Sequence, residues 1–387
     1  MTASPYDRRT AVIAAVGTAL PPRVVTNGQV IARGGLDSTD AWITSRTGIH
    51  RRRLAGPGTS TGDLATAAAR AALDAAADRA PVGTASGRAT LGAGPVPSTA
   101  PGPDLLLLAT TTPDRPCPAT APEVAHRLGL GPVPAFDLAA VCSGFLYALT
   151  VANALVSSGG CRTPLVVAAE KYSAIVDPFD RDTAPLFGDG AAAVLLRPGT
   201  PDEPGAVLAS DWGSDGGGSG LITVEAGGTR LPAADRLPRE QRHFRMSGRQ
   251  VYAHAVRRMA SSSAAALTAT GWRASDVRAF IGHQANQRIL DAVADRVGIA
   301  PAHRFGNIGE LGNTAGASIP LALADALARG RCAPGAPTLL TAFGGGLTWA
   351  SVTLRWPDAP VRAVEPPDPA PSDRLAPPRA PQEVSTP

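Results

Sequence analysis

Lysine is nearly absent from this sequence. Lys171 is the only lysine among 387 residues, and it stands in EKYSA without a glycine-rich lead. Schiff-base chemistry, pyridoxal-phosphate catalysis and phosphate loops of the form G-x-x-x-x-G-K-[ST] all need a lysine. The sequence therefore excludes these classes of protein.

Cysteine is also rare. The chain has 4 cysteines, and none of them forms a close pair: Cys117, Cys142, Cys161 and Cys332. This spacing provides neither a disulfide framework nor a zinc site. Free thiols suit a reducing compartment, so we expect a cytoplasmic protein.

Long apolar runs and dense charge are missing as well. No stretch approaches the ~18 apolar residues of a membrane span, and the charged N-terminus precedes only a short apolar run without a cleavage-type segment. The net charge of +4 is scattered rather than clustered. We therefore expect a soluble protein with no membrane or nucleic-acid partner, although an acidic partner or a phosphorylated ligand is compatible with this charge.

What the chain does have is apolar material for one large core or two fused medium ones, since 44% of its residues are hydrophobic. Two stretches lack apolar periodicity. Residues 81–103 are rich in Gly, Pro and Ser, and residues 358–387 are dominated by Pro and Ala. We predict a loop for the first and a disordered tail for the second.

Residues 136–160 organise the rest of the chain. A β-type run leads to Cys142 and a turn of small residues, and an alanine- and leucine-rich helical pattern follows at once. The free N–H groups and the dipole at a helix N-terminus stabilise an anion, so this position predicts a thiol with a lowered pKa. The alternative is a small buried core cysteine. Taken alone, this stretch leaves both interpretations open.

The order of elements repeats in the second half of the chain. The apolar run at 104–112 is typical of a strand buried on both faces of a parallel sheet, and residues 277–286 mirror it. Residues 305–330 mirror the strand, turn and helix around Cys142. We interpret this repeat as an internal duplication.

The spacing aligns Asn313 with Cys142. Cys142 lies 38 residues after the start of its preceding strand, and Asn313 lies 35 residues after Arg278. We predict an α/β fold in which an N-terminal half, 1–205, and a C-terminal half, 206–357, place their helix N-termini around one cleft.

Three polar residues at strand ends point to thioester chemistry. Cys142 belongs to the first half, and His283 in GHQAN and Asn313 in LGNTAG belong to the second. A thiolate can attack, an imidazole can donate or relay a proton, and an amide can hold an oxygen that becomes negative. A glycine turn in AFGGGLTWA could complete an oxyanion hole with the Cys142 N–H. Singly, these residues are also typical of a core histidine, a helix cap and a tight turn.

A second candidate cluster lies near the N-terminus. Asp37 or Ser38 could cap a short helix on which Trp42 and Arg46 share one face. An Arg beside a Trp can hold a flat phosphorylated ligand by stacking and charge. The alternative is a solvated basic loop with Trp42 packed inward.

The order Cys, His, Asn also occurs in papain-like proteases. The signature C-G-[SA]-C-[WY] is absent, and Cys142 lies inside a duplicated α/β unit without secretory or disulfide features. The sequence therefore disfavours a protease.

Five motifs together resemble the β-ketoacyl-[acyl-carrier-protein] synthase III family of the thiolase superfamily: FDLAAVCSGFLYAL, DRDTAPLFGDGAAAVLL, GHQANQRIL, LGNTAGASIPLALADAL and LLTAFGGGLTWAS. The resemblance implies a thiolase-like, five-layered αβαβα fold of two duplicated halves, usually as a homodimer. It implies an acyltransferase that condenses an acyl group from acyl-CoA with malonyl-[acyl-carrier protein] and needs no metal or redox cofactor.

The resemblance also assigns roles. Cys142 would be the acylated nucleophile, His283 and Asn313 the decarboxylation pair, and Gly345 an oxyanion donor beside the N–H of Cys142. Trp42, Arg46 and Arg181 would hold the adenine and phosphates of coenzyme A. Arg288 would lie at the mouth where the carrier protein docks.

Several residues depart from the family pattern. Asp182 replaces a common glycine and adds negative charge beside the expected coenzyme A phosphates. Cys117 stands where a phenylalanine often floors the partner subunit's acyl pocket, which predicts a longer or wider pocket here. The usual lysines of the carrier-protein patch are missing, and Arg257, Arg258 and Arg296 are the local substitutes.

Three functions are compatible with these features. They are a chain-initiating condensing enzyme, a relative that only transfers an acyl group to a natural-product acceptor, and a non-catalytic partner subunit. The intact Cys142 disfavours the last.

Overall fold

The computed structural model describes residues 9–79, 102–234 and 236–367. Two sheets form its frame. The first has the strand order β14-β1-β7-β6-β4-β5, and the second has the order β11-β12-β13-β8. The strands of the first sheet are β1 (Thr10–Ala19), β4 (Leu105–Ala109), β5 (Ala135–Leu138), β6 (Pro164–Glu170), β7 (Gly190–Gly199) and β14 (Val361–Val364). Those of the second are β8 (Val207–Ser214), β11 (Ala279–Gly282), β12 (Pro337–Gly344) and β13 (Thr348–Arg355).

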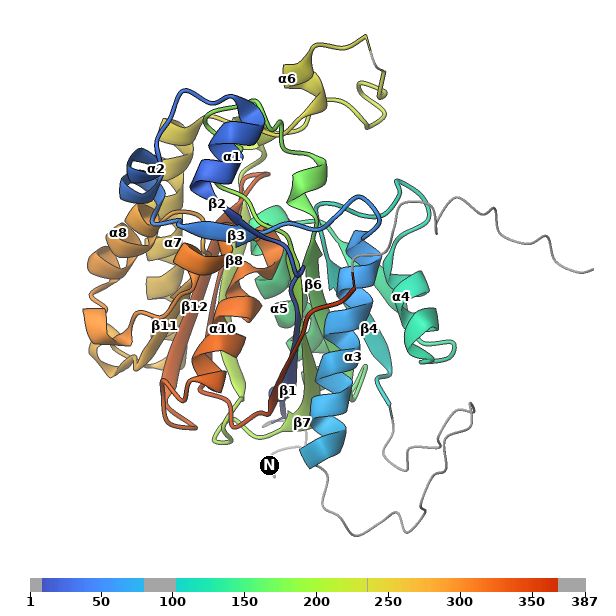
Figure 1. Ribbon diagram of the computed structural model, residues 1–387. Coiled ribbons are helices and arrows are strands. Elements are labelled where there is room, and N and C mark those ends of the chain that lie inside the picture. Colours follow the sequence, from blue (N-terminus) through green and yellow to red (C-terminus); the bar gives the residue numbers. More distant parts are fainter. Residues whose placement is uncertain (1–8, 80–101, 235, 368–387) are drawn as a thin grey trace, which may run out of the picture.

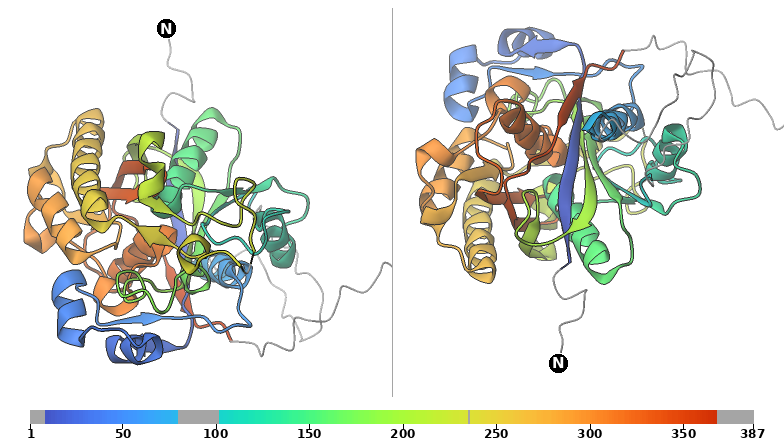
Figure 2. Two further views of the ribbon diagram at one scale, coloured as in Figure 1. Left: turned by 90° about the horizontal axis from the view of Figure 1, so that it is seen from above. Right: turned by 90° about the horizontal axis from the view of Figure 1, so that it is seen from below.

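Helices cover both sheets and fill the space between them (Figure 1). The two central helices are α5 (Gly144–Ser158) and α10 (Ser318–Ala328). The first sheet is covered outside by α3 (Thr61–Arg79) and α4 (Ala121–Leu128), and the second by α7 (Gly248–Thr270) and α8 (Gln287–Val297). Seen from above and below, the molecule therefore has the layers α, β, α, β, α (Figure 2).

Shorter elements surround the ends of the strands. They are β2 (Val24–Thr26), α1 (Asn27–Gly34), α2 (Asp40–Thr47), β3 (Arg51–Arg53), β9 (Ile222–Thr223), α6 (Arg239–Arg242), β10 (Arg245–Met246) and α9 (Ile308–Leu311). Single helical turns of the 3₁₀ type precede both central helices, at Val141–Ser143 and Ala315–Ala317.

The burial pattern explains the layers. Leu105 and Leu107 of β4 pack into the core between the sheets, while Leu106 and Leu108 pack under α3 and α4. A strand with both faces covered needs a continuous apolar run, which confirms the interpretation of that stretch. The two central helices are apolar nearly all round because they contact a sheet on each side.

The strand pairing repeats in the two halves. β4 pairs parallel with β6 and β11 pairs parallel with β12, while β6–β7 and β12–β13 are antiparallel. β1 and β8 then add to β7 and β13, again antiparallel. The predicted duplication is confirmed.

The predicted alignment of Asn313 with Cys142 is wrong by three residues. Val141 and Ala315 both adopt positive φ, 47° and 45°, directly before the central helices. This shared backbone feature makes Gly316 the counterpart of Cys142, and Asn313 lies one short turn earlier. Spacing alone could not reveal the difference because the loops before the two turns have different lengths.

Two further expectations need correction. β14 pairs parallel with β1, so the predicted disordered tail contains a strand at its start; residues 368–387 lie outside the described residues, as do 80–101 of the predicted loop. By length and composition, Val141–Ser158 is apolar enough to cross a membrane, with a mean hydropathy of 1.5. Half of this window is buried, because α5 packs between the two sheets.

Candidate active site

Cys142 lies on the turn between β5 and α5. The residue before it, Val141, has φ 47°, which is a strained conformation for a β-branched side chain. The β12–β13 turn closes over this segment. A Cβ on Gly344 would lie only 2.8 Å from the Cys142 nitrogen, and the Thr348 hydroxyl donates to the Ala140 carbonyl at 3.0 Å. Only glycine permits this approach at position 344.

The structure brings Cys142, His283 and Asn313 together at one cavity of about 40 Å³. Its other walls are mainly apolar and include Phe187, Phe244 and Phe343. The three polar residues come from different elements: the turn before α5, the end of β11 and the turn before α10. The cavity therefore lies where the two halves of the molecule meet.

His283 presents one defined nitrogen to this cavity. Its Nδ1 lies 2.7 Å from the Ser318 hydroxyl oxygen, which also accepts the Gln284 N–H at 3.2 Å. The hydroxyl proton of Ser318 is thus available to Nδ1, and this network assigns the ring proton to Nε2. Burial lowers the pKa of His283 to about 3. The imidazole is consequently neutral and acts as a hydrogen-bond donor.

Asn313 is oriented in a similar way. Its side-chain oxygen accepts the Ala315 N–H at 2.9 Å, which leaves the Nδ2 group as the donor that remains for a ligand. Backbone bonds fix the residue beside Phe187: the Asn313 N–H donates to the Leu186 carbonyl at 2.9 Å, and the Gly188 N–H donates to the Asn313 carbonyl at 3.0 Å. Two neutral donors, from His283 and Asn313, thus serve one cavity.

The Cys142 thiol differs from our expectation. Burial raises its pKa, the nearby Glu170 carboxylate raises it further, and the N–H of Cys142 itself lowers it by a smaller amount. The predicted lowering by the helix N-terminus is therefore wrong in direction, because the thiol packs against an apolar cluster that contains Phe187 and Phe244. The resting nucleophile is a protonated thiol.

Glu170 was not identified from the sequence. It is fully buried at the end of β6 and accepts hydrogen bonds from Thr111 N and Oγ at 3.0 and 3.1 Å, Thr112 Oγ at 3.1 Å and Gly316 N at 3.3 Å. Burial raises its pKa to about 8. A carboxylate directly after an apolar strand was the available signal. Glu170 links the turns that carry the site in the two halves.

The predicted coenzyme A residues are also close to one another. The Arg46 and Arg181 guanidinium carbons lie 5.4 and 4.9 Å from the Trp42 ring centre. Trp42 is partly exposed on α2, so it is not packed inward. The helix cap is Thr39, whose hydroxyl accepts the Trp42 N–H at 3.1 Å, rather than Asp37 or Ser38.

Arg288 is exposed in the first turn of α8. That helix contacts α2, and the end views show the blue N-terminal helices beside the orange ones (Figure 2). Asp182 lines a polar hollow together with Arg245 and Met246, and Met246 also lines the cavity at Cys142. The acidic residue therefore lies on the approach to the site and faces a cation.

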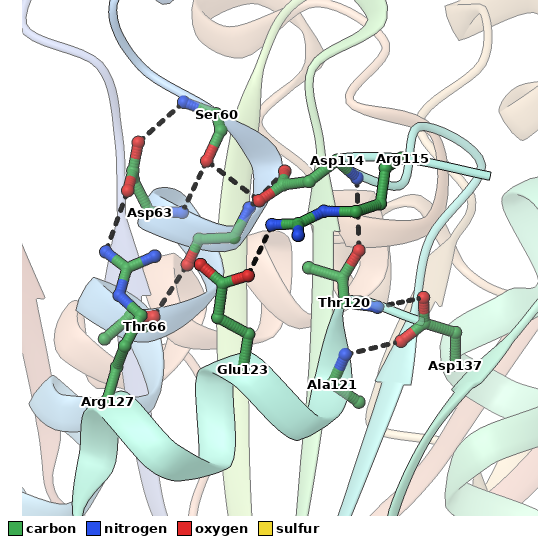
Figure 3. A network of polar contacts seen from close by, with 11 residues as sticks. Ser60, Asp63, Thr66, Asp114, Arg115, Thr120, Ala121, Glu123, Arg127 and Asp137 are labelled. Carbon is green, nitrogen blue, oxygen red and sulfur yellow. Dashed lines mark hydrogen bonds and ion pairs between the residues drawn. The ribbon is translucent and has the colours of Figure 1, made fainter. Parts of the chain in front are cut away.

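Cys117 is exposed on the loop between β4 and α4, away from the residues that line the cavity. A polar network holds both ends of this loop (Figure 3). Asp114 accepts the Gly62 N–H at 2.9 Å, and Asp137 accepts the backbone N–H groups of Thr120 and Ala121 at 2.8 and 2.7 Å. The loop is a fixed surface feature of the subunit, and its predicted role in a partner's pocket stays a prediction.

Comparison with known proteins agrees with the site. Residues 136–216 match the family described as 3-oxoacyl-[acyl-carrier-protein] synthase III, and residues 267–356 match its C-terminal part. A β-ketoacyl-[acyl-carrier-protein] synthase III from Streptomyces coelicolor is 50% identical over 93% of this chain and 98% of its own length. The chain belongs to the β-ketoacyl-[acyl-carrier-protein] synthase III family.

Solved structures of the family agree in fold. The 3-oxoacyl-(acyl carrier protein) synthase III of Pseudomonas aeruginosa is 43% identical, with a TM-score of 0.79 over 90% of this chain and 99% of that one. The priming β-ketosynthase of the R1128 polyketide pathway is 33% identical, with a TM-score of 0.79 over 93% and 100%. The thiolase-like fold is thereby confirmed, and the chain is an acyl-transferring condensing enzyme that initiates fatty-acid or polyketide synthesis. The papain-like alternative is excluded.

Proposed function

We propose that Cys142 takes an acyl group from acyl-CoA, and that His283 and Asn313 then support its condensation with malonyl-[acyl-carrier protein]. One observation carries this proposal: a thiol and two neutral donors, an imidazole N–H and an amide N–H, share a single small cavity. Decarboxylation leaves negative charge on a thioester oxygen, which is the group that two such donors stabilise.

The first half-reaction is acyl transfer. The sulfur of Cys142 attacks the thioester carbonyl, the bond to the coenzyme A sulfur breaks, and the thiol proton ends on the released coenzyme A. We assign the oxyanion formed on the way to the N–H groups of Cys142 and Gly345, since the β12–β13 turn closes directly over the Cys142 nitrogen. The reaction uses only side chains and backbone groups, so we propose that it needs no cofactor.

The second half-reaction forms a carbon–carbon bond. The malonyl thioester loses carbon dioxide, and the electrons of the broken bond form an enolate held by His283 and Asn313. The enolate carbon attacks the acyl-enzyme carbonyl, the Cys142 sulfur leaves and takes up a proton, and a 3-ketoacyl-carrier protein results.

The entrance is the proposed binding surface for both substrates. Trp42, Arg46 and Arg181 form a cationic and aromatic cluster suited to the adenine and phosphates of coenzyme A. Arg288 is exposed beside it and is proposed to meet the acidic carrier protein. Arg258 is a poor candidate for docking, because it pairs with Asp215 at 3.3 Å and stacks on Trp349.

We also propose a homodimer, located in the cytoplasm. β5 lies at the edge of the first sheet, and its Phe136 is 43% exposed. An open strand edge with an exposed aromatic side chain favours pairing with a second copy. Analytical ultracentrifugation tests this: we expect a dimer that Phe136→Arg dissociates, and a monomeric wild type contradicts it.

Acyl loading tests the assignment of the nucleophile. After incubation with acetyl-CoA, the intact mass should show one acyl group, and peptide mapping should place it on Cys142. Cys142→Ala should abolish loading, whereas Cys332→Ala, which changes a partly exposed thiol elsewhere, should load normally. An adduct on another cysteine, or no adduct with any acyl-CoA, sinks the proposal.

A further inference from the structure

The aromatic wall behind Cys142 contains a residue that the proposed mechanism does not use. Tyr172 is fully buried on the turn that follows β6. Its ring stacks on Phe187 at 4.5 Å and meets Phe244 edge-on at 5.5 Å. Cys142 packs against this cluster, and Phe187 and Phe244 line the cavity at the nucleophile. Tyr172 is therefore one layer from the space that an acyl group on Cys142 must occupy.

The Tyr172 hydroxyl has no hydrogen-bond partner within the part of the chain that the structure describes, although the oxygen is buried. The nearby Thr111 hydroxyl is already directed to the Glu170 carboxylate at 3.1 Å. Native proteins rarely leave a buried hydroxyl unpaired, because its desolvation is then uncompensated. An unpaired donor beside a nucleophile is thus a place for a polar atom of the ligand.

The charge state of Tyr172 defines what that atom must be. Burial raises the pKa of the phenol, and the charges of Cys142 and Glu170 raise it further. The group is therefore a neutral phenol, which can donate its proton to an acceptor oxygen. Its response to both charges also places it close to the sulfur that carries the acyl group.

We propose that Tyr172 is a specificity determinant that donates a hydrogen bond to a hydroxyl or oxo oxygen on a short acyl group bound to Cys142. This inference rests on the proposed role of Cys142. The small size of the cavity, about 40 Å³, favours a short chain. The wall of Phe187 and Phe244 packs against its carbon atoms, and the one unpaired hydroxyl selects its oxygen. A site that holds a substrate oxygen in this way discriminates against the analogue that lacks it.

A matched pair of substrates and an isosteric variant test the proposal. The initial rate of covalent loading is measured by intact mass for butyryl-CoA and for each enantiomer of 3-hydroxybutyryl-CoA, with 3-oxobutyryl-CoA as the second oxygenated probe. For the wild type we expect at least one oxygenated acyl group to load about tenfold faster than butyryl, or more, as a buried hydrogen bond allows. Tyr172→Phe, which removes only the hydroxyl, should abolish or invert this preference.

The controls separate the possible failures. Thermal unfolding of Tyr172→Phe shows whether the fold is intact, and alkylation of Cys142 by iodoacetamide shows whether the thiol is unchanged. An equal ratio of rates in wild type and variant overturns the proposal, as does an equal loss for all acyl groups, which would mean that the hydroxyl acts on the thiol. Wild type that loads acetyl but none of the four-carbon groups overturns it too. If acetyl-CoA itself gives no adduct, the proposed function fails instead.

Discussion

Glu170 and Cys142 are coupled at the residue scale. The thiol is buried, and the Glu170 carboxylate raises its pKa further. Replacing the carboxylate by an amide of the same shape removes this negative charge while an oxygen remains to accept the N–H groups of Thr111 and Gly316. The thiol pKa must then fall, since one cause of its elevation is gone.

We therefore predict that Glu170→Gln accelerates alkylation of Cys142 by iodoacetamide at a fixed pH below the thiol pKa. Each unit by which the pKa falls raises the thiolate population, and hence the rate, about tenfold. The pH profile of the alkylation rate measures this shift. Glu123→Gln, at an exposed position on α4, is the control and should leave the profile unchanged. A profile for Glu170→Gln that coincides with the wild type contradicts the coupling.

The sequence was sufficient for Cys142, His283 and Asn313, because each stands in a short motif at a strand end. It was not sufficient for the groups that orient them. Ser318 bonds to His283 from 35 residues away, and Glu170 reaches Gly316 across 146. The direction of the Cys142 pKa shift was wrong for the same reason: the helix N-terminus is visible in the sequence, whereas the burial of the thiol comes from distant aromatic side chains.

Two tight turns define the site at the scale of elements. Val141 and Ala315 hold matching positive φ values before the central helices, and the β12–β13 turn lies against the first of them. The strand and helix pattern was predictable, since both-face burial writes continuous apolar runs into the sequence. The three-residue error in aligning the halves was not avoidable, because turn geometry depends on backbone angles that composition does not encode.

The close approach at Gly344 yields a prediction. In Gly344→Ala the new methyl group would meet the Cys142 nitrogen at 2.8 Å, so the turn must shift away from the nucleophile. We expect a loss of stability of about 1–3 kcal/mol, as overpacking typically costs, together with slower acylation by acetyl-CoA. Thermal unfolding and intact-mass kinetics measure the two effects. Gly216→Ala is the control, since a Cβ there meets nothing within 4 Å. Acylation at the wild-type rate in Gly344→Ala contradicts the role given to this turn.

At the scale of the whole molecule, the duplicated fold brings together donors from two halves that the chain keeps far apart. The thiol belongs to the first half, and both neutral donors belong to the second. The family resemblance of five motifs predicted this architecture, and the sheet topology and the relatives confirm it. The strand β14 was missed because its four residues lie in a proline-rich context and gain their order only by pairing with β1.

The central claim is that Cys142 supplies the acyl group while His283 and Asn313 stabilise an enolate. The most direct measurement isolates the acetylated enzyme, adds malonyl-[acyl-carrier protein], and follows carbon dioxide and the mass of the carrier protein. The wild type should release carbon dioxide and give a 3-ketoacyl-carrier protein. Asn313→Asp should keep its acetyl group on Cys142 and slow this step by roughly 10²- to 10³-fold, because a carboxylate repels the charge that the amide stabilises. The account is contradicted if Asn313→Asp condenses like the wild type, or if the wild type leaves the malonyl group intact and passes its acetyl group unextended to another acceptor.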